Sequence, residues 1–158
     1  MKHPFHIVIQ ARDLSEARRF YSTALGAVEC RAKADSLEFN LYGHHLVCQL
    51  NPALGKGGRV SSYFHSIEAH GLPVPRCGVV LELGIWRRLV DRLVRYDVDF
   101  IVEPFVRCEG HPSEEAMMVL HDSSGNGLEF KSFRDIDAQL FAVSPDAFPS
   151  LEDTQYID

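Results

Sequence analysis

The sequence predicts an α+β fold made of two successive modules, each a strand, a helix and three further strands (βαβββ), around one central cleft. The first observation is a repeat, because residues 4–21 and 75–93 both contain a proline, an apolar strand pattern, a short polar break and a helix with an Arg-Arg pair. The second is that "GHHLVCQL" (43–50) aligns with "GNGLEFKSF" (125–133), glycine to glycine and leucine to leucine. The third is a set of strand candidates between each helix and the last strand of its module: 27–33 and 36–42 in the first, 98–106 and 116–121 in the second.

These elements predict one domain over residues 1–135, with module one at 3–50 and module two at 73–133. The connector between the modules (51–72) is rich in Gly, Ser and Pro, and we expect it to be irregular. Residues 136–158 form an acidic tail with two prolines, which we expect to wrap the surface or to stay mobile.

The two predicted helices carry apolar residues at helical spacing. Asp13 followed by Glu16 resembles a capping box at the start of the first helix, and Gly26 is a helix stop. We expect the apolar positions to pack against the sheets: Leu14, Ala17, Phe20, Tyr21 and Ala24 in the first helix, and Trp86, Leu89, Val90, Leu93 and Val94 in the second.

Strand alternation assigns side chains to the two faces of each sheet. A single module cannot bury both faces, so we expect the helices to cover the outer faces while the sheets curve around the cleft. In the first strand the apolar Phe5, Ile7 and Ile9 should meet the helix, which turns His6 toward the cleft. Alternation predicts these further cleft-facing residues: Val8 and Gln10; Glu38, Asn40 and Tyr42; Arg76, Gly78, Val80 and Glu82; Glu129 and Lys131; with His45, Val47 and Gln49 sharing one face.

The composition argues against several functions. A net charge of −6 over 158 residues does not favour a nucleic-acid surface. No apolar run reaches membrane-spanning length, and the N-terminus lacks the apolar stretch of a signal peptide. The four cysteines form no Cys-x-x-Cys motif, so we expect a reduced, cytoplasmic protein.

Six segments carry a family pattern: "PFHIVI", "DLSEARRFYSTALG", "YGHHLV", "VPRCGVVLEL", "VDFIVEPFVR" and "DSSGNGLEFKSFRD". On these segments the chain resembles, over residues 4–135, the vicinal oxygen chelate superfamily, which includes glyoxalase I, bleomycin resistance proteins and extradiol dioxygenases. More narrowly, it resembles bacterial glyoxalase-like proteins taken to be extradiol-type dioxygenases. The resemblance implies the glyoxalase/bleomycin resistance/dioxygenase fold, a small-molecule substrate in the cleft between the modules, and a homodimer.

The resemblance also implies a divalent metal (Fe, Zn, Mn or Ni), held by a His on the first strand, a His at the start of module two and a Glu on the last strand. The matching positions are His6, Arg76 and Glu129, so an arginine stands where the family has its second histidine, "VPRCG" in place of "VPHFG". A fourth, carboxylate ligand of some members falls on Val47. Arginine stays protonated, offers no lone pair and repels a dication, so Arg76 argues against a bound metal.

Three interpretations of Arg76 are open. In the first, its guanidinium pairs with Glu129, replaces the cation and binds an anionic or vicinal-dioxygen ligand, with Lys131 as an alternative partner of the carboxylate. In the second, another histidine supplies the missing ligand: His44, His45, His65 or His70. In the third, Arg76 turns outward and is solvated.

Two functions are therefore expected. The first is an enzyme, a glyoxalase-like lyase or isomerase or an extradiol-type dioxygenase, with Glu129 in a catalytic role at the metal. The second is a metal-free protein that binds or sequesters a small molecule, as a resistance protein does. The candidate substrate contacts are Arg76, Gln10, Tyr42, Gln49, Lys131 and Arg107, and the polar loop at 107–118 adds Glu115.

Overall fold

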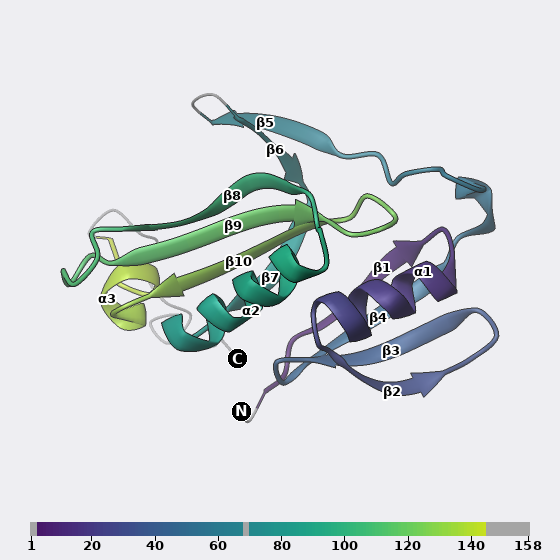
Figure 1. The fold of residues 1–158 in the computed structure, drawn as a ribbon, viewed down its shortest axis with the longest axis horizontal. Coiled ribbons are helices and arrows are strands. Elements are labelled where there is room, and N and C mark those ends of the chain that lie inside the picture. Colours follow the sequence, from purple (N-terminus) through teal and green to yellow (C-terminus); the bar gives the residue numbers. More distant parts are fainter. Residues whose placement is uncertain (1–2, 68–69, 145–158) are drawn as a thin grey trace, which may run out of the picture.

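The computed structural model describes residues 3–67 and 70–144, and it contains the predicted βαβββ order twice (Figure 1). Module one consists of β1 (His6–Ala11), α1 (Leu14–Arg18), a π-helical turn η1 (Arg19–Ala24), β2 (Val28–Ala32), β3 (Ser36–Leu41) and β4 (His44–Leu50). Module two consists of β7 (Arg76–Val80), α2 (Leu83–Arg95), β8 (Phe100–Arg107), β9 (Glu115–His121) and β10 (Gly127–Phe133). The predicted α+β architecture of paired modules is confirmed.

The two sheets have the same topology. Their strand orders are β1-β4-β3-β2 and β7-β10-β9-β8. In each sheet the first and last strands of the module pair in parallel, and the other pairs are antiparallel. His6 pairs with His45 in module one, and Arg76 pairs with Gly127 in module two. His6 and Arg76 therefore occupy equivalent positions in the two modules.

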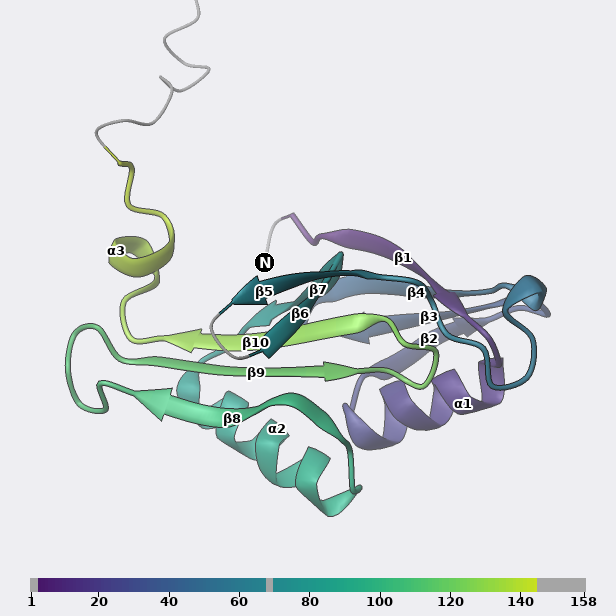
Figure 2. The same cartoon turned by 90° about the horizontal axis from the view of Figure 1, so that it is seen from above.

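Both helices lie on the same side of the sheets (Figure 2). The core fills the space between them, and its largest fully buried side chains include Tyr21, Phe39 and Phe130. Ile7 and Ile9 pack against this core as alternation predicts, which leaves His6 on the opposite face. Two apolar predictions are wrong, because Phe5 precedes the strand and is 64% exposed, and Val94 is 61% exposed at the end of α2.

The predicted helix start at Asp13 is confirmed in part. The Asp13 carboxylate accepts a hydrogen bond from the Glu16 backbone N–H at 2.8 Å. Glu16 does not complete a capping box, because its carboxylate instead accepts from Arg12 Nε at 2.7 Å. The helical segment ends at Ala24, and Gly26 follows with φ +76°, which a glycine adopts without strain.

The first strand of module two is shorter than its apolar pattern predicts. It ends at Val80, and Leu83 already belongs to α2. Glu82 was predicted to face the cleft, but its carboxylate caps α2 by accepting a hydrogen bond from the Gly84 N–H at 2.9 Å. The carboxylate satisfies a free N–H at the helix start, so helix capping overrides the continuation of the strand.

The connector is not irregular throughout. It contains a 3₁₀ turn, Pro52–Leu54, and most of a β-hairpin formed by β5 (Tyr63–Ile67) and β6 (His70–Val74). Leu72 of β6 is 5% exposed, so the hairpin packs on the domain. The predicted tail contains a short helix, α3 (Ile136–Leu140), and residues 145–158 lie outside the described part. None of the described helices has the length and apolar character needed to cross a membrane.

A buried carboxylate joins the two modules. Asp122, in the turn before β10, is 5% exposed and accepts a hydrogen bond from the Tyr21 hydroxyl of module one at 2.9 Å. It also accepts from the backbone N–H groups of Ser124 and Asn126, each at 2.8 Å. Burial, and then the charge of Asp122, raise the pKa of Tyr21 well above its usual value, so this hydroxyl stays a donor. The side chain of Asn126 donates to the Gln10 carbonyl at 2.7 Å, which adds a second inter-module bond.

Candidate functional site

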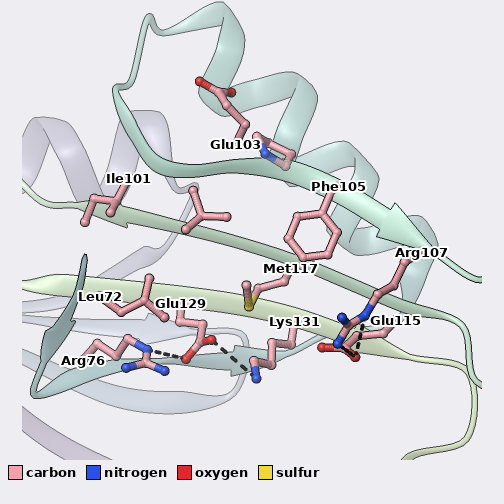
Figure 3. Close-up of a pocket in the computed structure, with 12 residues that line it drawn as sticks. Leu72, Arg76, Ile101, Glu103, Phe105, Arg107, Glu115, Met117, Glu129 and Lys131 are labelled. Atoms are coloured by element: carbon pink, nitrogen blue, oxygen red, sulfur yellow. Dashed lines mark hydrogen bonds and ion pairs between the residues drawn. The ribbon is translucent and has the colours of Figure 1, made fainter. Parts of the chain in front are cut away.

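Module two carries a partly polar cavity of about 640 Å³ on the sheet face away from α2 (Figure 3). The hairpin borders it through Leu72, and the sheet supplies the rest of the wall. The lining residues are Leu72, Arg76, Ile101, Val102, Glu103, Pro104, Phe105, Arg107, Glu115, Met117, Glu129 and Lys131. Three predicted contacts, Arg76, Lys131 and Arg107, therefore meet here with Glu129.

Arg76 forms an ion pair with Glu129. Its Nε donates to Glu129 Oε2 at 2.6 Å, and the two side chains are only 23% and 15% exposed. This is the contact predicted by the first interpretation, and Arg76 does not turn outward as the third interpretation requires. Lys131 Nζ lies 3.4 Å from Glu129 Oε1, so the carboxylate has both of its predicted cationic partners. Oε1 is buried without a hydrogen bond, so the Lys131 contact is a looser ion pair.

Two glycines make room for this pair. A Cβ at Gly78 would lie 1.6 Å from the Glu129 carbonyl oxygen, so only glycine lets β7 approach β10 beside the carboxylate. A Cβ at Gly127 would lie 3.0 Å from the Cβ of Arg76 and 2.8 Å from Pro73 Cγ. The absence of side chains at these positions thus keeps Arg76 beside Glu129.

The floor of the cavity is apolar and a second ion pair stands at its far end. Phe105 and Met117 form part of the floor (Figure 3). Arg107 Nη2 donates to Glu115 Oε2 at 2.7 Å across β8 and β9. The β8–β9 register shifts between Val102 and Phe105, and such a bulge redirects side chains. The charged side chains thus border the apolar floor at two places, with the exception of Glu103, which points away from them in Figure 3.

The other predicted contacts lie elsewhere. Gln10 accepts a hydrogen bond from the Asn51 side chain at 2.6 Å, and Gln49 donates to the Asp35 carbonyl at 3.0 Å. Tyr42 follows β3 in a turn with φ +52°, where burial raises its pKa. None of the three lines the module-two cavity.

Sequence reasoning missed the apolar lining. Leu72, Ile101, Phe105 and Met117 each come from a different part of the chain or from a bulged strand. Alternation could have assigned Met117 to the cleft, because it pairs with Lys131 on the neighbouring strand. The hairpin that brings Leu72 over this face has no such signal in the sequence.

His6 lies on β1 in the sheet of module one, and its side chain contacts that of His45 on β4. Its Nδ1 is 2.9 Å from Nδ1 of His45, and His45 Nε2 is 3.2 Å from Glu38 Oε2. A smaller cavity of about 330 Å³ between the modules is lined by both His45 and Arg76. His44 accepts from the Phe5 N–H at 3.0 Å and is not placed as a ligand beside Glu129. His65 lies on β5, and the side chain of His70 is outside the described residues.

These residues do not fit the three-ligand metal site that the resemblance implies. Arg76 occupies one ligand position with a positive charge, and both oxygens of Glu129 face cationic side chains. Within residues 3–67 and 70–144, no group of three or more His, Cys, Asp or Glu side chains has an arrangement that could hold a metal ion. Glu129, paired with Arg76 and Lys131, is therefore not arranged as a metal ligand.

No protein-family model matches the chain, and no curated protein sequence matches it. Solved structures do. A glyoxalase/bleomycin resistance protein/dioxygenase from Alicyclobacillus acidocaldarius is 29% identical, with a TM-score of 0.66 over 88% of this chain and 96% of that one. A glyoxalase/dioxygenase from Nostoc punctiforme is 15% identical (TM-score 0.61; 85% and 92% covered). The fosfomycin resistance protein FosX from Listeria monocytogenes is 14% identical (TM-score 0.56; 84% and 93% covered).

The last two likenesses concern the fold alone, and the first extends to the sequence. All three proteins match this chain over nearly their whole length, so both modules take part in the likeness. The repeated βαβββ order and the equivalent registers of the two sheets agree with it. The chain thus has the glyoxalase/bleomycin resistance/dioxygenase fold, and its likeness to the Alicyclobacillus acidocaldarius protein supports the resemblance to the vicinal oxygen chelate superfamily.

Proposed function

We propose that this protein binds a small oxygenated molecule with a carboxylate or vicinal oxygens in the module-two cavity, without a metal at Glu129. The observation that carries the proposal is the ion pair between Arg76 and Glu129, at 2.6 Å in a mostly buried setting. The arginine neutralises the carboxylate that would otherwise attract a cation. The same guanidinium provides donors for an anionic ligand.

Donors remain available for such a ligand. Nε of Arg76 is used by Glu129, and Nη1 makes only a long contact of 3.5 Å with the Pro73 carbonyl. Within the described part of the chain Nη2 has no hydrogen-bond partner. Lys131 is 31% exposed and is held by its 3.4 Å ion pair, with its Nζ also 5.9 Å from the centroid of the Phe133 ring. A ligand carboxylate at this end would receive hydrogen bonds from both cations, while its carbon skeleton lies on Phe105 and Met117.

The neighbouring proteins support a small-molecule role. The FosX proteins from Listeria monocytogenes and Mesorhizobium loti, which share the fold, are fosfomycin resistance proteins, and this supports a role in resistance for the cavity. A metal-dependent lyase or dioxygenase is the second candidate, favoured by the likeness to the Alicyclobacillus acidocaldarius protein. It requires a metal at residues other than Arg76 and Glu129. We also expect the protein to act as a homodimer in the cytoplasm.

The test compares matched ligands that differ only in charge. Benzoate and 2-hydroxy-2-phenylacetate are titrated into the untagged protein by calorimetry, with benzamide as the neutral counterpart. We expect the carboxylates to bind, benzamide to bind at least about tenfold more weakly, and EDTA to change nothing. Arg76→Gln and Lys131→Met should each weaken binding, whereas Arg87→Gln, on the exposed face of α2, should not. Equal binding of benzamide, or binding that EDTA abolishes, would overturn the proposal.

A further inference from the structure

A further cavity, of about 470 Å³, lies where module one and the connector meet one end of module two, and we call it the junction cavity. In Figure 1 two loops of module two extend toward module one at this end, the loop between α2 and β8 and the turn between β9 and β10. Phe20 of η1 and Arg59 of the connector also line the cavity. Its volume is in the range of small-molecule sites. Of its lining residues only Ile101 also lines the module-two cavity, so the two cavities have different walls.

Three charged side chains of the junction cavity have no partner. Arg59 comes from the connector, whereas Asp97 and Asp99 come from the loop between α2 and β8. All three residues are exposed, and within the described part of the chain none of their side chains makes a hydrogen bond or an ion pair. Asp122 also lines the cavity, but its carboxylate already accepts from the Tyr21 hydroxyl. A guanidinium and two carboxylates are therefore open to a ligand.

Two neutral polar groups belong to the same lining. Ser123 Oγ is buried and has no hydrogen-bond partner among the described residues. Buried hydroxyls are nearly always hydrogen-bonded, so this one remains unsatisfied until a ligand or a water molecule reaches it. Burial, and then the charge of Arg59, lower the pKa of His121, so the imidazole is mainly neutral near pH 7. Arg59 thus supplies the positive charge of this lining.

Charges of both signs beside apolar rings favour a ligand that carries both signs. Phe20 and Phe100 are half-buried and line the cavity together with the charged side chains. A simple anion would be repelled by the carboxylates, and a simple cation by the guanidinium. We propose that the junction cavity binds a small zwitterion with an apolar group, such as an apolar α-amino acid. Arg59 pairs with its carboxylate, Asp97 and Asp99 pair with its ammonium, and its apolar group lies on the phenylalanine rings.

Such a ligand would contact both modules. Phe20 belongs to module one, and both aspartates belong to a loop of module two. Binding would therefore add a link between the modules beside the hydrogen bond from Tyr21 to Asp122. A ligand that binds only the folded state also raises the midpoint of unfolding. The inference does not depend on the ligand proposed for the module-two cavity.

The first experiment compares zwitterions with analogues that keep one charge. L-Leucine and L-phenylalanine are titrated separately into the untagged protein by calorimetry at pH 7, and we expect one molecule to bind per chain. The analogues without the carboxylate are 3-methylbutylamine and 2-phenylethylamine. Those without the ammonium are 4-methylpentanoate and 3-phenylpropanoate. Each analogue should bind the junction cavity at least about tenfold more weakly than its parent amino acid.

Substitutions that remove one charge at a time locate the site. Arg59→Gln, Asp97→Asn and Asp99→Asn should each weaken amino-acid binding at least about tenfold. Residue 97 has a left-handed backbone with φ +53°, which asparagine tolerates, so Asp97→Asn removes the charge without new strain. The matched controls are Arg88→Gln and Asp91→Asn on the exposed surface of α2, and neither should change binding.

Histidine ring spectra give a readout that is independent of affinity. The amino acid should shift the ring resonances of His121 and leave those of His45, on the sheet of module one, unchanged. Variants are compared after their circular dichroism spectra and urea midpoints have been matched to wild type. The proposal is overturned if neither amino acid binds with a Kd below about 10 mM, if the single-charge analogues bind the junction cavity equally well, or if Arg59→Gln keeps full affinity. Loss of binding in Arg76→Gln alone would place the amino acid in the module-two cavity, which also overturns it.

Discussion

The two modules share a backbone but differ in the chemistry of equivalent positions. In each, the first strand pairs in parallel with the last, and the pair that begins the register is His6–His45 in module one and Arg76–Gly127 in module two. The glycine leaves space that Arg76 fills, whereas the histidine at the same place meets His6. Two imidazole rings thus face one another in one module, and a cation faces a carboxylate in the other.

The environments of the two clusters differ as well. The hairpin borders the module-two site, where Glu129 is 15% exposed, whereas His6 on module one is exposed. Charges interact more strongly when water is excluded, so the ion pair in module two should contribute more to stability than the histidine pair. The two modules have the same strand topology. What each can bind therefore depends on its side chains and on whether the hairpin borders the site.

The largest expected effect concerns Asp122, the buried carboxylate that joins the two modules. Asp122→Ala removes the acceptor of the Tyr21 hydroxyl and of two backbone N–H groups. Each donor left buried without a partner costs about 1–3 kcal/mol, so we expect the free energy of unfolding to fall by about 3 kcal/mol or more. Urea denaturation followed by circular dichroism measures this loss, with Asp91→Ala on exposed helix surface as the control. A loss below about 1 kcal/mol would show that the modules are joined mainly by apolar packing.

The sequence predicted the repeated backbone well, because alternation and helical spacing are local signals that burial enforces. The pairing of Arg76 with Glu129 was also predictable, since alternation places both on one face and an arginine next to a carboxylate forms an ion pair. The register that sets His45 rather than Glu129 beside His6 was not predictable, because it depends on which strands lie side by side.

The hairpin was missed for a different reason. Tyr63–Ile67 and His70–Val74 follow a stretch rich in Gly and Ser, and no Asn-Gly or Asp-Gly turn joins them. The prediction that Glu82 faces the cleft was wrong because an acidic residue before Gly84 is compatible both with the end of a strand and with a helix N-cap. Each failure lies where a long-range contact or a capping hydrogen bond overrides the local pattern.

An intermediate effect should separate the two clusters. Arg76→Ala leaves Glu129 mostly buried with only the looser Lys131 contact, and we expect a loss of about 1–3 kcal/mol of unfolding free energy. His6→Ala, at the equivalent exposed position, should change stability by no more than about 0.5 kcal/mol. Urea denaturation of Arg76→Ala, Glu129→Ala and the double variant gives the coupling energy between the two residues. A coupling near zero, or an equal loss from His6→Ala, would remove the energetic distinction between the modules.

The smallest effect concerns the thiols, because each module has one exposed and one less accessible cysteine. Cys30 and Cys108 are exposed, whereas Cys48 is buried and Cys77 is half-buried. Burial, and then the charge of Asp122, raise the pKa of Cys77 to about 11, and the same causes raise the pKa of Cys48 further. Since the thiolate is the reactive form, native protein at about pH 8 should react quickly with an aromatic disulfide reagent at Cys30 and Cys108 alone.

The order in which Cys77 and Cys48 react at higher pH then compares how well the two modules protect their buried thiols. As the pH approaches the pKa of Cys77, this thiol should react before Cys48, because Cys48 is completely buried while Cys77 lines the inter-module cavity. Peptide mapping of the labelled sites identifies the thiols, and protein unfolded in guanidinium, with all four cysteines reactive, is the control. Rapid labelling of Cys48 in native protein would mean that module one opens more readily than module two, because a fully buried thiol reacts only when the structure around it opens.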